Sequence, residues 1–272
     1  MNTKQSLHTH CTFCDGKDTP EQIIETAIEK GFGAVGFSSH SYTSFSSIYT
    51  LKPGKTEEYK AHINSLRPIY EDKIDIFLGL EFDMLSDDTD LSGYDYVIGT
   101  VHSLKTKEGI TAFDRSQEVV QGIIDTHFGG DGMAYAKAYF EHLSHLAQYG
   151  SFDILGHFDI ITKHADNVKF FDEQSKDYMK WATDAMDTLS GKIPFFEVNT
   201  GAISRGYRKS PYPRPALIKE LKARGFGAVI TSDCHDRNHL DCRFDEAAEL
   251  LRACGFKEKY ILTKSGWKAV SL

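Results

Sequence analysis

The sequence contains no long apolar run and no obvious disulfide framework. A membrane-spanning helix needs about 18 or more consecutive apolar residues, and no such stretch is present. The five cysteines are an odd number, which argues against a paired framework. Cys11 and Cys14 have C-x-x-C spacing, but no second pair follows to complete a structural zinc site. We therefore expect reduced thiols and no membrane partner.

Excess positive charge and a secretion signal are also missing. The formal net charge is −8, which disfavours a general surface for the phosphate backbone of nucleic acids. The first six residues lack the apolar core of a signal peptide, so we expect a cytoplasmic protein. No feature of the sequence indicates an oligomeric state. The 272 residues, 40% hydrophobic and 26% charged, can enclose a substantial core.

What the sequence does contain is an alternation of short apolar strands and amphipathic helices. Strands are predicted at 4–7, 34–38, 74–80, 94–100, 152–155, 193–198 and 227–231, with a strand-like segment at 260–262. Helices are predicted at 20–30, 56–70, 117–126, 132–149, 175–189, 215–224 and 244–254. Thr19 is a suitable N-cap for the first helix, and Gln22 completes a capping box. No repeat or long linker divides the chain, so we expect one domain over 1–272.

Strands that alternate with helices favour a parallel sheet. Two arrangements fit: a closed β/α barrel of seven or eight units, or an open doubly wound sheet. Polar residues follow six of the strands at their C-terminal ends. In a barrel all these ends meet on one face, whereas in an open sheet the outermost strands lie too far apart to share a site. The polar residues therefore favour the barrel.

Histidines and acidic residues at the strand ends form a pattern typical of a metal centre. His8 and His10, one residue apart on an extended segment, point to the same side and can bind one ion. Later strands are followed by His40, Glu81, His102, His157, Asp233 and His235. A lone histidine is more often a hydrogen-bonded, partly buried side chain. We expect this structural role for six other histidines: His62, His127, His142, His145, His164 and His239.

These groups are too numerous for one ion with about four to six ligands. We expect two to three divalent ions (zinc, manganese or iron), with a carboxylate such as Glu81 bridging two of them. Closely spaced ions suit hydrolysis at phosphorus. A phosphate substrate also needs cationic anchors, for which Arg205 and Lys163 are the candidates. The alternative is that both are ordinary surface charges.

Seven short segments resemble the polymerase and histidinol phosphatase (PHP) superfamily, and within it the monofunctional histidinol-phosphatases. They are Leu-His-Thr-His at 7–10, Phe-Ser-Ser-His at 37–40, Gly-Leu-Glu-Phe-Asp at 79–83, Gly-Thr-Val-His at 99–102, Leu-Gly-His-Phe-Asp at 155–159, Glu-Val-Asn-Thr at 197–200 and Ser-Asp-Cys-His at 232–235. The resemblance implies a distorted, TIM-like (β/α)7 barrel with a trinuclear metal centre at the C-terminal ends of the strands.

By position, the resemblance also assigns ligands to each ion. The first ion would be held by His8, His10, Glu81 and Asp233. Glu81 would bridge to a second ion on His102 and His157. The third would be held by Asp15, His40 and His235, although some relatives have histidine in place of Asp15. The expected catalytic residues are Glu81, Asp233 and His235, and the substrate phosphate would lie near Lys163 and Arg205.

The implied activity is the hydrolysis of L-histidinol phosphate to L-histidinol and phosphate, in histidine biosynthesis. One alternative is a PHP phosphoesterase that acts on nucleotides or another small phosphate ester. The other is a non-catalytic, metal-stabilised module, which the full ligand set and the lack of a polymerase extension disfavour. Asp159 and Glu197 are candidates for recognising the amine and imidazole of the substrate.

Overall fold

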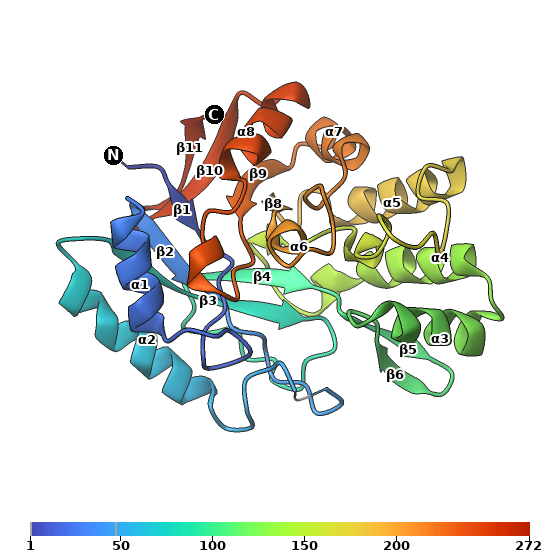
Figure 1. Ribbon diagram of the computed structural model, residues 1–272, viewed down its shortest axis with the longest axis horizontal. Helices are drawn as coiled ribbons and strands as arrows, with labels where there is room; N and C mark the ends of the chain where they lie inside the picture. Colours follow the sequence, from blue (N-terminus) through green and yellow to red (C-terminus); the bar gives the residue numbers. More distant parts are fainter. Residues whose placement is uncertain (1, 47) are drawn as a thin grey trace.

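The computed structural model describes residues 2–46 and 48–272, and within them seven parallel strands form a nearly closed barrel (Figure 1). The strands, in sheet order, are β1 (Gln5–Ser6), β2 (Ala34–Phe37), β3 (Asp75–Asp83), β4 (Tyr96–Thr100), β7 (Ile154–Leu155), β8 (Phe195–Asn199) and β9 (Gly227–Thr231). Each strand pairs in parallel with the next. The predicted seven-unit barrel is confirmed.

The barrel closes between β1 and β9 just past the ends of these strands. Thr9 and Cys234 form an isolated parallel bridge, and the amide of His10 donates to the Cys234 carbonyl oxygen at 2.8 Å. The hydroxyl groups of Ser6 and Ser232 lie 3.1 Å apart. The segment that carries the first two histidines is therefore part of the barrel closure.

Helices surround the barrel (Figure 1). They are α1 (Pro20–Glu29), α2 (Thr56–Tyr70), α3 (Gln117–Phe128), α4 (Gly132–Leu143), α5 (Lys176–Leu189), α6 (Gly201–Ser204), α7 (Pro215–Ala223) and α8 (Phe244–Ala253), with 3₁₀ turns η1 (Leu146–Gln148), η2 (Ile160–Thr162) and η3 (Arg237–His239). The predicted capping box is present: the Thr19 hydroxyl accepts from the Gln22 amide, and the Gln22 side chain accepts from the Thr19 amide. In the described part of the chain, no helix has both the length and the apolar character of a membrane span.

One predicted helix was too long. The segment 132–149 is α-helical only to Leu143, and the 3₁₀ turn η1 follows it. The His145 amide donates to the His142 carbonyl, three residues back, and the Ser144 hydroxyl donates to the Glu141 carbonyl. These local bonds replace the regular helical pattern and end α4.

The described chain also contains two antiparallel hairpins, of which the sequence predicted only the strand-like segment 260–262. The first is β5 (Ser103–Thr106) with β6 (Gly109–Ala112), and the second is β10 (Glu258–Thr263) with β11 (Gly266–Ser271). Most side chains of β6 and β11 are exposed or half-buried, so neither strand shows a clear apolar pattern. The second hairpin packs Tyr260 and Trp267 against Phe195, at the N-terminal end of the barrel.

Tyr96 fills part of the barrel interior between two glycines. Its ring lies so close to Gly36 and Gly79 that a Cβ atom at either position would overlap it. The Tyr96 hydroxyl donates to the carbonyl oxygen of Leu7, the residue that follows β1. The Tyr96 ring on β4 therefore needs glycine at Gly36 on β2 and at Gly79 on β3.

We predict that Gly79→Ala lowers the free energy of unfolding by about 1–3 kcal/mol, because the new methyl group would displace the Tyr96 ring. The matched control is Gly122→Ala on α3, where an added Cβ meets no described atom within 4 Å. The control should be neutral or stabilising by up to about 1 kcal/mol, because alanine favours helix. Urea denaturation measures both. Equal effects would show that Tyr96 packing does not constrain this position.

Candidate metal centre

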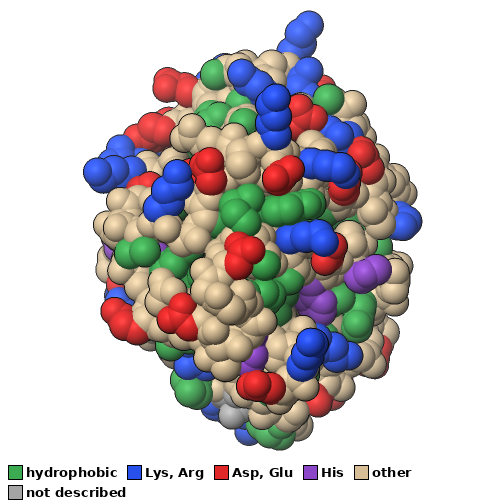
Figure 2. All heavy atoms as spheres, turned by 90° about the vertical axis from the view of Figure 1, so that its right-hand side faces the viewer, with side chains coloured by type: hydrophobic (Ala, Val, Ile, Leu, Met, Phe, Trp, Pro, Cys, Tyr) green, Lys and Arg blue, Asp and Glu red, His purple; other side chains and the backbone are tan. Residues whose placement is uncertain are grey.

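The nine predicted ligands gather at the end of the barrel toward which the strands point. Each has a side-chain atom within 3.3 Å of another member of the set. Figure 2 views the molecule from this side, where histidine side chains reach the surface among acidic and basic ones. The barrel therefore brings together residues from six strand ends, as the sequence predicts.

Glu81 lies at the middle of the cluster and is 1% exposed. Its Oε2 atom lies 2.7 Å from His40 Nδ1 and 3.2 Å from His8 Nε2. Its Oε1 atom lies 2.9 Å from His157 Nε2 and 3.3 Å from His102 Nε2. Because the two carboxylate oxygens face different imidazoles, Glu81 is placed where it could bridge two ions.

Three groups of side chains in the described chain have ligand atoms close enough to hold an ion, all within 4.8 Å of one another. They are His10, Asp15, His40 and His235; His8, His10 and Asp233; and His40, Glu81 and His102. The groups share members, because His10 belongs to the first and second groups and His40 belongs to the first and third. The geometry thus supports a joined centre rather than separate sites.

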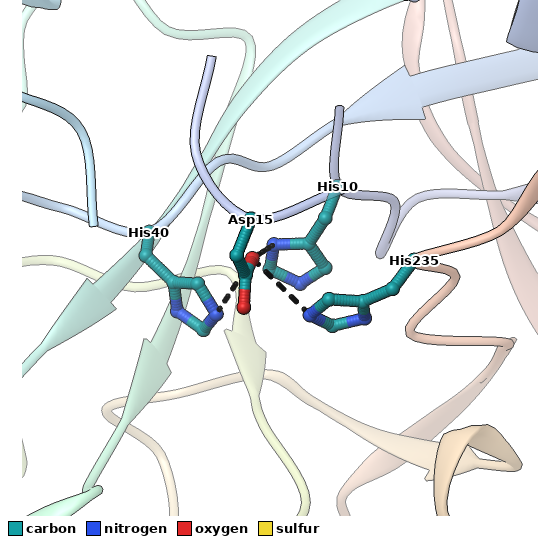
Figure 3. A group of neighbouring side chains, drawn as sticks. All are labelled: His10, Asp15, His40 and His235. Atoms are coloured by element: carbon teal, nitrogen blue, oxygen red, sulfur yellow. Dashed lines mark ion pairs between the residues drawn. The ribbon is translucent and has the colours of Figure 1, made fainter. Parts of the chain in front are cut away.

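Asp15 lies among the imidazoles of His10, His40 and His235 (Figure 3). Its Oδ1 atom is 3.3 Å from His235 Nε2 and 3.7 Å from both His40 Nε2 and His10 Nδ1. Its side chain is 31% exposed. Asp15 is therefore placed where it could bind an ion together with these imidazoles, with access from solvent.

A second layer of carboxylates, missed as such by the sequence analysis, orients the histidines. Glu197 lies 2.8 Å from His8 Nδ1 and accepts a hydrogen bond from the His157 amide at 2.7 Å. Asp83 lies 3.2 Å from His102 Nδ1 and accepts from the His102 amide at 3.0 Å. With Nδ1 engaged in this way, Nε2 of His8 and of His102 faces the centre.

The second layer corrects one of our expectations. Glu197 is fully buried and is occupied by His8, so it has no surface to offer a substrate. Asp159 is also fully buried, and its Oδ2 atom accepts from the Arg214 amide. Neither residue is available to recognise the amine or imidazole.

The spacing of these polar residues was the signal for a second layer in the sequence. Glu81 and Asp83 are two residues apart on one strand, as are Glu197 and Asn199 on another, so the two side chains of each pair point to the same face of their strand.

The electrostatics keep His10 and Glu81 in metal-binding form. Burial, together with His235 and His40, lowers the pKa of His10 to about 3, so this imidazole is neutral. Burial alone would raise the pKa of Glu81, but the imidazoles of His40 and His8 outweigh it and hold the pKa well below its usual range. Neutral imidazole and ionised carboxylate are the states that bind a divalent ion. Burial alone would lower the pKa of His8, His40 and His102, but the carboxylates around them, Glu81 among them, outweigh it and raise the pKa, so a bound ion would displace protons from these three imidazoles.

Several buried ligand atoms have no hydrogen-bond partner in the described chain. They are His8 Nε2, His10 Nε2 and Glu81 Oε2, and both histidine nitrogens lie within 3.4 Å of that oxygen. Buried polar atoms without partners are rare and costly. A divalent cation would satisfy all three, and the nitrogen and oxygen donors suit zinc, manganese or iron. The residues therefore fit a metal.

A cavity of about 240 Å³ opens over the centre and is lined by both predicted anchors. Lys163 Nζ lies 2.7 Å from Asp114 Oδ1. Arg205 binds Asp233 twice, with Nη1 donating to the carbonyl oxygen and Nη2 to Oδ2, both at 2.9 Å. Arg205 thus supports a predicted ligand, in addition to facing the cavity.

Residues 6–201 match the model of the PHP domain family. This chain belongs to the PHP family. It is 27% identical over 263 residues to the Deinococcus radiodurans protein named "Probable histidinol-phosphatase", covering 91% of this chain and 92% of that protein. It is 23% identical over 269 residues to the Histidinol-phosphatase of Bacillus subtilis, covering 90% and 98%.

The fold of this PHP chain is similar to a solved structure of the histidinol phosphate phosphatase from Lactococcus lactis. The TM-score is 0.71 at 19% sequence identity, and the match covers 98% of this chain and 99% of the other. That protein was solved in complex with zinc, L-histidinol and phosphate. The likeness confirms the distorted barrel.

We predict that zinc raises the melting temperature of the PHP chain, because an ion bound only by the native state stabilises it, by ~4 kcal/mol at 1,000 times Kd. Glu81→Ala should lose most of this shift, since it removes the carboxylate between two sets of imidazoles. His62→Ala is the control, because His62 lies on α2 and pairs only with Glu21 among the described ion pairs. Thermal melts with and without zinc measure the effect. An unchanged zinc shift in Glu81→Ala would refute its central position.

Proposed function

We propose that this chain is a metal-dependent phosphomonoesterase that hydrolyses L-histidinol phosphate to L-histidinol and phosphate in histidine biosynthesis. One observation carries the proposal: a buried cluster of imidazoles and carboxylates lies under a cavity that Lys163 and Arg205 line. The similarity to proteins named histidinol-phosphatase supports this substrate. The cytoplasmic location stays a prediction from the sequence.

We further propose two to three divalent ions per chain, assigned to ligands as the family resemblance implies. The zinc in the Lactococcus lactis structure supports zinc here, with manganese or iron as alternatives. Bound ions would supply a reactive water at neutral pH and offset the charge of the phosphate. We propose that residues 1–272 act as one PHP domain around this centre.

Within this proposal, Lys163 and Arg205 bind the phosphate oxygens. The phosphate of the ester carries close to two negative charges near neutral pH, and a guanidinium offers paired donors to such a group. Arg205 also lies 2.9 Å from His235 Nδ1. We assign catalysis to Glu81, Asp233 and His235, which line the same cavity as the two anchors.

Two alternatives make different predictions. A phosphoesterase for nucleotides would use the same centre with another outer wall. A non-catalytic module would keep the metal ligands for stability alone, but it would not need two cations at the mouth of a solvent-open cavity. The side chain of Arg205 is 30% exposed, which leaves it accessible to a ligand.

A substrate panel tests the proposed function. With zinc present, kcat/KM for L-histidinol phosphate should exceed that for nucleoside 5′-monophosphates and p-nitrophenyl phosphate by on the order of a hundredfold. Faster hydrolysis of the nucleotides would favour the first alternative. A zinc-loaded protein that hydrolyses none of these esters would favour the module.

We predict that Arg205→Ala lowers kcat/KM for L-histidinol phosphate by on the order of a hundredfold, about 2.7 kcal/mol. Zinc affinity should weaken as well, because Arg205 holds Asp233. Arg205→Lys should recover only part of the loss, since an ammonium lacks the planar fork of donors. Arg252→Ala, in the last turn of α8, is the control. If the two alanine variants have equal kcat/KM values, the phosphate anchor lies elsewhere.

A further inference from the structure

The cavity wall contains a carboxylate that belongs to none of the predicted metal ligands. Asp114 lines the cavity in the described chain together with Asp15, Glu81 and Asp233, all three of which are predicted ligands. The Asp114 side chain is 30% exposed and its Oδ1 atom lies 2.7 Å from Lys163 Nζ. It is therefore both reachable from solvent and next to a proposed phosphate anchor.

The fold holds Asp114 at this position through its two neighbours. The hairpin β5–β6 starts directly after His102 and returns to it, where the Phe113 amide donates to the His102 carbonyl at 3.0 Å. On the other side, the Arg115 carbonyl accepts from His164 Nε2 at 2.7 Å, and Arg115 Nη2 donates to Ser46 Oγ at 2.8 Å. The hairpin thus places Asp114 at the mouth of the cavity rather than in free solvent.

Asp114 is negatively charged in a cavity that should attract anions. Burial alone would raise the pKa of Asp114, but Lys163 and the nearby His102 hold it well below its usual value. A carboxylate at this position repels a phosphate group and lowers the net positive charge of the wall. For binding the phosphate group alone, this negative charge is unfavourable.

The wall therefore carries both signs of charge side by side. Lys163 lies 4.4 Å from the ring centroid of Tyr207 and pairs with Asp114, so the cation and the anion are both fixed. A ligand with a phosphate and an ammonium group a few bonds apart is complementary to this pair. The phosphate would contact Lys163, and the ammonium group would contact Asp114.

We propose that Asp114 binds the ammonium group of the substrate and makes the enzyme selective for phosphate esters of amino alcohols. The proposal rests on the proposed function, whose substrate carries a protonated amine on the carbon next to the esterified one. Asp114 is then a specificity-determining residue. The competing interpretation is that Asp114 only positions Lys163, and an experiment can separate the two.

The test uses Asp114→Asn with two substrates that differ in one group: L-histidinol phosphate and its des-amino counterpart, 3-(imidazol-4-yl)propyl phosphate. Asparagine keeps an oxygen that accepts from Lys163 but removes the charge. For the amine-bearing ester, kcat/KM should fall by on the order of 30-fold, mainly through KM. For the des-amino ester it should stay within about threefold of the wild-type value.

Two outcomes would overturn the proposal. An equal loss with both esters would assign Asp114 to positioning Lys163, and no loss with either would make it a surface charge. Asp114→Glu should keep the preference for the amine, and zinc-induced stabilisation checks that each variant retains its metal centre. Asp184→Asn on α5, which removes an exposed partner of Lys180, is the matched control.

A failure of the proposed function would be visible separately, in the wild-type protein. If the wild type does not prefer L-histidinol phosphate, ethanolamine phosphate and ethyl phosphate give the same comparison of esters with and without an amine. An Asp114-dependent preference for ethanolamine phosphate would then support the inference with a different substrate. A wild-type protein that does not prefer ethanolamine phosphate over ethyl phosphate would contradict the inference directly.

Discussion

Glu81 imposes the main physical constraint on this structure, because an ionised carboxylate in a protein interior needs compensating charge. The side chain is 1% exposed. The imidazoles of His8, His40, His102 and His157 lie within 3.3 Å of its oxygens. These histidines come from four different strand ends, so the barrel closure, the second layer of carboxylates and the cavity are all arranged around one buried acid.

The backbone at Asp233, another member of the cluster, is strained and tightly packed. This residue has φ of 45°, in the left-handed region that non-glycine residues seldom adopt. Arg205 donates to both its carbonyl oxygen and its carboxylate, and Gly201 leaves the space that its side chain occupies. The adjacent Cys234 closes the barrel through the His8 and His10 backbone. A predicted metal ligand, a proposed phosphate anchor and the closure of the barrel thus meet at Asp233 and Cys234.

The sequence predicted the barrel and the histidines and carboxylates that gather at its end, because strand ends and side-chain alternation are local signals. It could not predict which oxygens of Glu81 face which histidines, because that depends on how separate strands pack. Glu197 shows the limit most clearly: its strand position suggested an active-site role, but only the structure shows it bound to His8. The hairpin that carries Asp114 to the cavity was missed because few of its side chains are buried.

In our proposal, the buried cluster holds more than one metal ion around Glu81. Anomalous diffraction at the zinc absorption edge, from crystals of the zinc-loaded protein, tests it most directly. We expect at least two anomalous peaks on either side of the Glu81 carboxylate, one beside His8 and the other beside His102. A single peak away from Glu81, or none in protein that is fully active, would contradict a metal centre built around Glu81.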